Sequence, residues 1–419
     1  MSATTAVQVV VTGGAGQIAY SLVPLIARGL VFGPETKVNL RLLDIPHSAT
    51  ALKGVAMEVQ DSLFLSVLDG IIATTDEAKA FEGAQVAILL GGFPRRPGME
   101  RGDLIGKNAG IMKRMGEDLE KYASRDCKVL VVANPAPTNC CVLASHAPSI
   151  PRKNISCLSR LDHDRMVGML LHEANRCLSV ATGSNGNGSH GGISNGGGSA
   201  RRRLGPADIR GVCVWGNHSN SQVPDASAVE FLVDGRWTPA ASVIRDAAWL
   251  TLSSNSHESF DADGEPVLGL AEGVRGRGAA VLGARKLSSA MSAANAIASH
   301  LKDWLVQPEA PGAPQVVSMG VASDGNPFGV PEGLFCSFPV RCLGDGDWAF
   351  AEGFLLKEEA GHQLSLSVKE LQEEKAMVVE ALGDDAFDRP TPSPHPADAG
   401  TTLDKAAKGL SNGTPISSL

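Results

Sequence analysis

The chain has 419 residues, of which 43% are hydrophobic and 20% are charged, so its length and composition predict a soluble globular protein of two or three domains. Its formal net charge of −8 argues against a nucleic-acid backbone or an anionic membrane surface as the main partner. No apolar run approaches the ~18 residues of a membrane span, and the start MSATTAVQVVVTGG lacks the basic segment of a secretory signal. The eight cysteines show no regular spacing, which indicates reduced thiols in an intracellular protein rather than a disulfide framework.

Strand and helix patterns alternate along the first third of the chain. Apolar, β-branched runs predict strands at residues 7–11, 38–43, 86–90 and 129–132, and helical patterns predict helices at residues 18–30, 51–59 and 108–122. This alternation is typical of parallel βαβ units and predicts an α/β fold. Right-handed crossovers place the carboxyl ends of such strands on one edge of the sheet, where ligands bind.

A glycine turn follows the first predicted strand directly. Gly13, Gly16 and Ala19 give the spacing G-x-x-G-x-x-A between a strand and a helix, which suits a tight turn, a close approach to a pyrophosphate and a phosphate at the helix N-terminus. Asp44 ends the second strand, where an acid can bind ribose hydroxyls and repel a 2′-phosphate, so NAD is favoured over NADP. The alternative is that Asp44 only caps the next helix.

A histidine and an acid–arginine pair form the second candidate site. His218 stands in VWGNHS, and Asp162 and Arg165 stand in LDHDR. Because Asp162 and Arg165 are three residues apart, they share one face of the predicted helix. Together they could serve a histidine base and a carboxylate substrate, although each residue alone is as consistent with packing or helix capping. The buried face of the helix is predicted from apolar residues at four-residue spacing: Met166, Leu170, Ala174 and Leu178.

The stretch FPRRPGMERGD, residues 93–103, carries Arg95, Arg96 and Arg101 among prolines and glycines. One interpretation is a solvated basic loop. The other is a mobile lid that brings guanidinium groups onto an anionic substrate and excludes water.

The chain resembles the lactate/malate dehydrogenase family, and within it the cytosolic-type malate dehydrogenase branch. The resemblance rests on many longer stretches that occur in the same order over residues 7–385. The matching stretches are TGGAGQIAYSL, LRLLDI, PRRPGMERGDL, VVANPAPTNC, APSIP, SCLSRLDHDR, VWGNHSNSQ, RGAAV, ARKLSSAMSAA, VSMGVASDGNPFGVP and SFPV. The resemblance implies an N-terminal Rossmann-type parallel sheet with a C-terminal α+β substrate domain. It also implies an NAD-dependent oxidoreductase that interconverts malate and oxaloacetate, in a homodimer.

The resemblance implies a role for each residue at a matching position. His218 is the general acid/base and Asp162 the carboxylate that holds it, while Arg165 binds the C1 carboxylate of the substrate. Arg101 polarises the reacting carbonyl, and Arg95 recognises the second carboxylate. No metal is expected. The residues expected to contact the cofactor or the substrate are Gly13, Gly14, Ala15, Gly16, Gln17, Ile18, Ala19, Asp44, Asn108, Val132, Ala133 and Asn134.

Two positions depart from the cytosolic-type pattern. Met115 stands where relatives usually carry a glutamine among the cofactor contacts, and Ala133 stands where they usually carry glycine.

Two alternative functions remain open beside malate oxidation: another 2-hydroxy-acid dehydrogenase, or a catalytically silent NAD-binding scaffold.

Three segments have little to bury and are expected to be surface loops or coil: an insertion at 183–203, a loop at 253–266 and a tail at 388–419. The predicted domains are accordingly an NAD-binding domain at 1–157, a substrate domain at 158–387 that contains the insertion, and the tail. The expected compartment is the cytoplasm. The alternative is the peroxisome, because Ser417-Ser418-Leu419 shares two letters with a peroxisomal signal.

Overall fold

The structure is a computed structural model that describes residues 6–64, 66–94, 99–181, 202–252, 268–307 and 316–388. Arg95 and Arg96, the stretch 183–200, the loop 253–266 and the tail from residue 389 onward lie outside the described residues.

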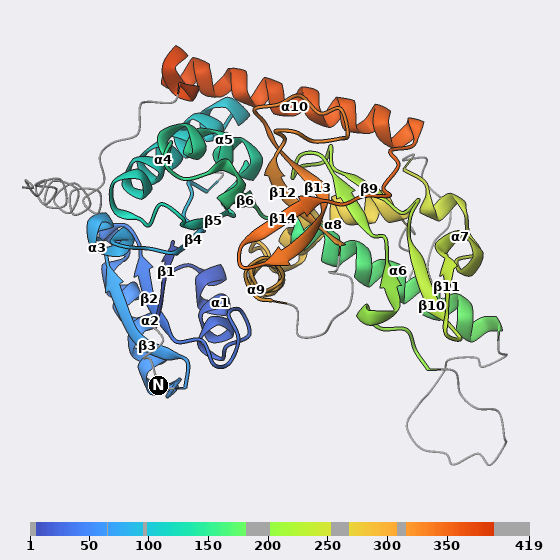
Figure 1. Ribbon diagram of the computed structural model, residues 1–419, viewed down its shortest axis with the longest axis horizontal. Helices are drawn as coiled ribbons and strands as arrows, with labels where there is room; N and C mark the ends of the chain where they lie inside the picture. The colour runs from blue at the N-terminus through green and yellow to red at the C-terminus, as the bar shows by residue number, and fades with distance from the viewer. Residues whose placement is uncertain are drawn as a thin grey trace, which may run out of the picture.

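One continuous sheet of nine strands runs through both halves of the chain (Figure 1). Its first six strands are parallel, in the order 3-2-1-4-5-6 of a doubly wound dinucleotide-binding sheet. Three later strands extend it antiparallel from β6, through a single pair between Cys157 and Gly320. In spatial order the strands are β14 (Asp347–Phe350), β13 (Phe335–Gly344), β12 (Val316–Ala322), β6 (Ile155–Cys157), β5 (Lys128–Val131), β4 (Val86–Leu89), β1 (Val7–Thr12), β2 (Val38–Leu43) and β3 (Leu68–Thr74).

Helices cover both faces of this sheet, as the alternating pattern predicts. Their bounds are α1 (Gln17–Ala27), α2 (Ala49–Asp61), α3 (Glu77–Phe81), α4 (Arg101–Tyr122), α5 (Ala136–His146), α6 (Arg160–Ala181), α7 (Ala240–Val243), α8 (Leu270–Arg285), α9 (Met291–Leu305) and α10 (Glu358–Leu382). The long α10 contacts α4 and α5 of the first half and β9 of the second, so it spans both halves (Figure 1).

Two smaller sheets complete the second half. They comprise β7 (Ile209–Arg210), β10 (Glu230–Val233) and β11 (Arg236–Pro239) in one, and β8 (Cys213–Trp215) and β9 (Val223–Asp225) in the other. These strands and their helices confirm the predicted fold class, an α/β chain whose second half is α+β.

Strand β1 shows why this sheet is buried on both sides. Val9 and Val11 pack into the core on the face of α1 and α9, whereas Val10 packs into the core on the face of α4 and α5. Because successive side chains point to opposite faces, a strand covered on both sides needs a continuous apolar run.

The sequence misplaced several elements. It missed β3, an edge strand with no buried residue, and β6, which has only three residues. The helix predicted at 18–30 ends at Ala27, because Gly29 turns the chain with a φ of +74°. The helix predicted at 108–122 begins at Arg101, so this arginine lies on α4 and not in the loop.

A side-chain clamp closes the base of the insertion. The amide of Asn175, on α6, accepts from the backbone N–H of Leu204 at 2.8 Å and donates to its carbonyl at 3.1 Å. The chain that returns after the insertion is therefore tied to α6 two turns before that helix ends.

Candidate active site

Three predicted residues meet at the start of α6. The Nδ1 atom of His218 hydrogen-bonds Oδ2 of Asp162, and Nη1 of Arg165 lies 2.8 Å from Oδ1 of the same carboxylate. The side chain of Asp162 is 1% exposed, whereas those of His218 and Arg165 keep partial access to solvent. One buried carboxylate therefore orients both a histidine and a guanidinium.

The local folding of α6 fixes two of these side chains. Met166, Leu170 and Ala174 are buried in the third apolar cluster of the molecule, as their spacing predicts. Asp162 and Arg165, in the first turns of the same helix, are thus held at the edge of a packed surface.

The loop that carries His218 is anchored on two sides. Gly216 exchanges backbone hydrogen bonds with Ser337 of β13, at 3.1 and 2.8 Å. It also has a φ of +88°, and a Cβ there would lie 2.4 Å from Oγ of Ser367 on α10. Only glycine fits this turn, so the position of His218 depends on both the sheet and α10.

The environment sets the proton affinity of His218. Burial lowers the pKa of its imidazole, and the charge of Arg165 lowers it further. The charge of Asp162 and its hydrogen bond outweigh both, so the pKa of His218 is raised above 6.5. Since Asp162 occupies Nδ1, the Nε2 atom is the one available to exchange a proton with a ligand.

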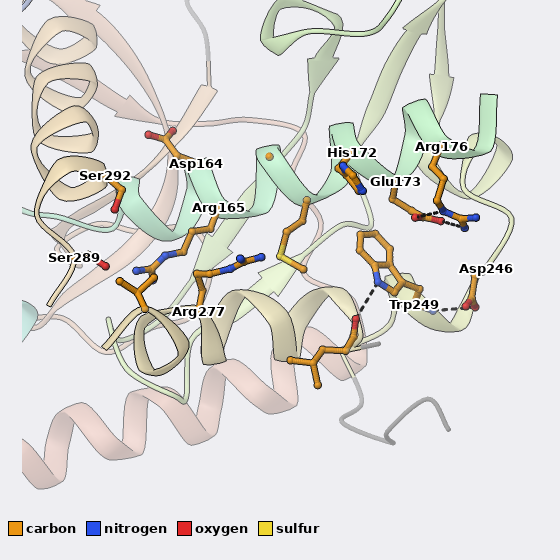
Figure 2. Close-up of a pocket in the computed structure, with 14 residues that line it drawn as sticks. Asp164, Arg165, His172, Glu173, Arg176, Asp246, Trp249, Arg277, Ser289 and Ser292 are labelled. Carbon is orange, nitrogen blue, oxygen red and sulfur yellow. Dashed lines mark hydrogen bonds and ion pairs between the residues drawn. The ribbon is translucent and has the colours of Figure 1, made fainter. Parts of the chain in front are cut away.

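A cavity of about 1060 Å³ opens beside Arg165, between α6 and α8 (Figure 2). Arg165 from α6 and Arg277 from α8 both point into it, and Ser289 and Ser292 line one end. The guanidinium of Arg165 lies against α8, because a Cβ at Gly278 would be 3.8 Å from its Nη2. The two guanidinium groups suit an anionic ligand at this end of the cavity, whereas the rest of its lining also includes the acids Asp164, Glu173 and Asp246.

The glycine turn lies at the carboxyl end of β1, where the strand order reverses. Gly13 has a φ of +66°, and a Cβ there would lie 3.1 Å from the backbone nitrogen of Gly91 after β4. The backbone N–H of Ala15 donates to Oδ2 of Asp44 at 2.9 Å. The structure therefore brings the predicted glycines and Asp44 together, as a dinucleotide site requires.

A second cavity of about 720 Å³ lies in front of this turn. It is lined by Ala15, Gly16 and Gln17 on one side and by Arg285 and Ser289 on the other. Among the described residues, no side chain caps the N-terminus of α1, so its N–H groups are available to bind an anion. These residues fit the pyrophosphate of a dinucleotide. This second cavity shares Val281, Ser289 and Ser292 with the cavity at Arg165, so the two adjoin.

Sequence reasoning missed the contribution of α8 and the segment that follows it. Arg285 and Ser289 belong to the stretch ARKLSSAMSAA, which carried a resemblance but no predicted role. The only local signal for a binding role is a basic residue followed by serines where the helix ends. This signal does not show that the stretch faces the glycine turn.

The remaining predicted cofactor positions cluster around the ends of β4 and β5. Val132 and Ala133 both donate their backbone N–H to the carbonyl of Leu89, and Asn134 is exposed just beyond them. Asn108, buried on α4, uses its side chain on the backbone of Phe93, accepting from N at 2.6 Å and donating to O at 3.3 Å. Its amide thus holds the residues that precede 95–98, and its contact to a cofactor stays a prediction.

Arg101 is not joined to His218. Its Nη2 lies 2.6 Å from a carboxylate oxygen of Glu370 and 2.6 Å from one of Glu374, both on α10. Nothing in the sequence indicates these partners, because KELQEEK has the composition of an ordinary solvated helix surface.

All eight cysteines are buried and free. Burial raises the pKa of Cys127 and Cys342 to about 12, which is unfavourable for a reactive thiolate. In the described ranges no helix is both long and apolar enough to cross a membrane, and no group of three His, Cys, Asp or Glu residues is arranged to hold a metal ion.

Comparisons with known proteins agree with this geometry. Residues 7–156 match the family model described as lactate/malate dehydrogenase, NAD binding domain, and residues 204–382 match its alpha/beta C-terminal domain. The malate dehydrogenase 1, cytoplasmic, of Arabidopsis thaliana is 42% identical over 378 residues, which cover 90% of this chain and 98% of that protein.

Solved structures give the same match. The malate dehydrogenase of Naegleria fowleri is 38% identical with a TM-score of 0.74, and the alignment covers 90% of this chain and 99% of that one. The lactate dehydrogenase of Trichomonas vaginalis, in complex with NADH and oxamate, is 32% identical with a TM-score of 0.73 over the same shares of the two chains.

Proposed function

We infer, because this chain belongs to the lactate/malate dehydrogenase family, that it is an NAD-dependent malate dehydrogenase that interconverts malate and oxaloacetate. The observation that carries this proposal is the buried carboxylate of Asp162, which binds His218 and Arg165 at once. This arrangement provides an acid/base group and a carboxylate clamp side by side. The direct test follows NADH consumption by purified protein with oxaloacetate, which a silent NAD-binding scaffold would not support.

The mechanism follows from the contacts of these side chains. In malate oxidation, Nε2 of neutral His218 takes the proton of the C2 hydroxyl, and Asp162 stabilises the resulting imidazolium. Arg165, with one nitrogen on Asp162, binds the C1 carboxylate with its remaining donors. NAD, when bound, supplies the acceptor for the hydride that leaves C2. Reduction of oxaloacetate uses the same groups with His218 protonated at the start.

Two further arginines complete the proposed substrate site. Arg101 polarises the C2 carbonyl, and Arg95 binds the second carboxylate, which distinguishes malate from lactate. The predicted glycine-turn residues, Asp44, Asn108 and residues 132–134 hold NAD. Another 2-hydroxy-acid substrate is the second candidate, since lactate dehydrogenases are among the similar solved structures. The relatives named cytoplasmic support the cytoplasm as the compartment.

The choice of cofactor tests the role of Asp44. Both oxygens of this carboxylate already accept backbone N–H groups, from Ala15 and Ile45, so its charge is fixed at the end of β2. We expect kcat/KM to be higher with NADH than with NADPH, and Asp44→Ser to narrow that preference by about tenfold or more, since it removes a charge-assisted acceptor. Asp69→Ser, on the exposed edge strand β3, is the matched control. Equal use of both cofactors by the unmodified enzyme would contradict this role.

We also propose that the protein is a homodimer. Large apolar side chains stay exposed on α1, on α2 and just after α2, namely Tyr20, Met57 and Leu63, and exposed apolar surface can mark a protein interface. Sedimentation equilibrium should give about twice the mass of one chain. Met57→Glu should shift this mass toward one chain, whereas Leu355→Glu, an exposed apolar residue before α10, should not. A single-chain mass for the unmodified protein at micromolar concentration would contradict the proposal.

A further inference from the structure

We propose that Glu370 and Glu374 of α10 are positioning residues that compete with the substrate for the Arg101 guanidinium. In the ligand-free enzyme they hold Arg101, and malate or oxaloacetate must take it from them. The inference rests on the role proposed above for Arg101.

The contacts show a specific holding site. A single nitrogen of Arg101, Nη2, lies 2.6 Å from Oε1 of Glu370 and 2.6 Å from Oε1 of Glu374. These two glutamates are four residues apart on α10, so their side chains lie on one face of the helix. The side chain of Glu374 is only 3% exposed. A buried carboxylate is stabilised by a cation, so this contact favours the held position of Arg101.

Both carboxylates keep other partners when Arg101 leaves. Glu370 accepts hydrogen bonds from the hydroxyls of Ser219 and Ser221, each at 2.5 Å, and from the amide of Asn217 at 3.0 Å. Glu374 accepts from the hydroxyl of Thr138 and from the same amide of Asn217. Because no carboxylate is left without a donor, release of Arg101 costs less than breaking an isolated buried pair.

The donors also keep Glu370 charged. Burial raises the pKa of this carboxyl, but its hydrogen bonds from Ser219, Ser221, Arg101 and Asn217 outweigh burial and lower the pKa to about 2. The held position therefore persists across the neutral pH range.

Arg101 remains able to reach a ligand. Its side chain is 51% exposed, and Nη2 is its only nitrogen that forms an ion pair within the described part of the chain. The holding site also lies next to the reaction centre, because Asn217, which bridges both carboxylates, directly precedes His218. The guanidinium is therefore held beside the chain segment that carries His218.

Competition of this kind has a distinct kinetic signature. If Arg101 is held in most free enzyme molecules, the apparent affinity for substrate is reduced by the fraction that is not held. Neutralising a glutamate should therefore improve affinity, whereas a glutamate that only supports the fold should, when changed, weaken activity.

The experiment compares Glu370→Gln with Glu373→Gln, measured as kcat and KM for oxaloacetate at saturating NADH. Glu370→Gln keeps a similar shape and should lower KM by about three- to tenfold while kcat stays within about twofold. Glu373→Gln is the matched control on the same helix, since Glu373 is exposed and its ion pair is with Lys369, at 3.9 Å. It should leave KM unchanged.

The same substitution in an Arg101→Gln background makes the test specific. There Glu370→Gln should no longer lower KM, because the competing cation is gone. An unchanged or raised KM for Glu370→Gln alone, or a lowered KM that persists without Arg101, would overturn the proposal.

Urea unfolding of Arg101→Gln, Glu370→Gln and the double variant provides a second measurement. The changes in the free energy of unfolding should be non-additive, because the two side chains form an ion pair, and this measurement does not depend on turnover. Additive changes would count against the proposal. If Arg101→Gln keeps wild-type kcat/KM, the role assigned to Arg101 in catalysis fails. If Arg101→Gln loses activity while Glu370→Gln leaves KM unchanged, only the competition for Arg101 fails.

Discussion

Replacing His218 with Asn should lower kcat for malate oxidation and oxaloacetate reduction by about 10²–10⁴-fold, the usual contribution of a general acid/base. NADH binding should change little, because in the proposed mechanism the imidazole contacts the substrate, and it is fixed by Asp162 rather than by the cofactor turn. The measurements are steady-state turnover and NADH fluorescence titration. His362→Asn, an exposed histidine on α10, is the matched control. Near-normal turnover of His218→Asn would rule out the assignment.

The pH dependence of kcat/KM tests the same assignment, because it should have opposite directions for oxaloacetate reduction and malate oxidation. Oxaloacetate reduction requires protonated His218, so its kcat/KM should fall as pH rises through the raised pKa of this residue. Malate oxidation requires the neutral form and should fall as pH drops through the same pKa. Asp162→Asn removes the charge that raises the pKa, so both limbs should move to lower pH. If the pH profiles of Asp162→Asn are unchanged, the pKa that they report belongs to a group other than His218.

The second large effect concerns the choice between oxaloacetate and pyruvate. These substrates differ only at the end remote from C1, so Arg165 and Arg101 can serve both. With pyruvate bound, the Arg95 guanidinium would be removed from water without a carboxylate partner. A charge-assisted hydrogen bond contributes ~1.5–3 kcal/mol, and leaving a buried charge unpaired costs more than that. The unmodified enzyme should therefore favour oxaloacetate by at least about two orders of magnitude in kcat/KM.

Arg95→Gln should sharply lower kcat/KM for oxaloacetate and raise the relative rate with pyruvate. Arg96→Gln, one residue away in the same stretch, is the matched control and should do much less. The assay is kcat/KM on both substrates for the three proteins. A shift of the ratio by Arg96→Gln, with none by Arg95→Gln, would place the discriminating guanidinium one position later.

The sequence predicts local chemistry better than distant partnership. Asp162 and Arg165 share a helix face because of their spacing, whereas the pairing of His218 with Asp162 was expected from the family resemblance; the structure brings all three together. Asp44 could be placed beside the glycine turn because parallel strands end on one edge. For the Asp162–Arg165 pair and for Asp44, a few residues and one structural rule are sufficient.

Distant contacts leave no such signal. Glu370 and Glu374 meet Arg101 across more than 260 positions of the chain, and nothing in a charged helix shows which of its acids is buried. The edge strand β3 was missed for a related reason, since a half-exposed strand with Asp69 and Gly70 lacks the apolar run on which strand prediction depends. The start of α4 was placed late because its first ten residues include Gly102, Gly106 and Gly110, which are poor helix formers.

The clamp between Asn175 and Leu204 makes the end of α6 a tolerant point for evolution. Because the two chain segments are tied together before the inserted stretch begins, added length there costs chiefly loop-closure entropy, about 0.6 kcal/mol for each doubling. Asp162 and Arg165 lie at the opposite end of the same helix, and its buried face fixes them independently of the inserted residues. We therefore expect changes in the length or composition of this segment to leave the positions of Asp162 and Arg165 unchanged. For the same reason, a reporter or affinity tag could be introduced at this point of the chain.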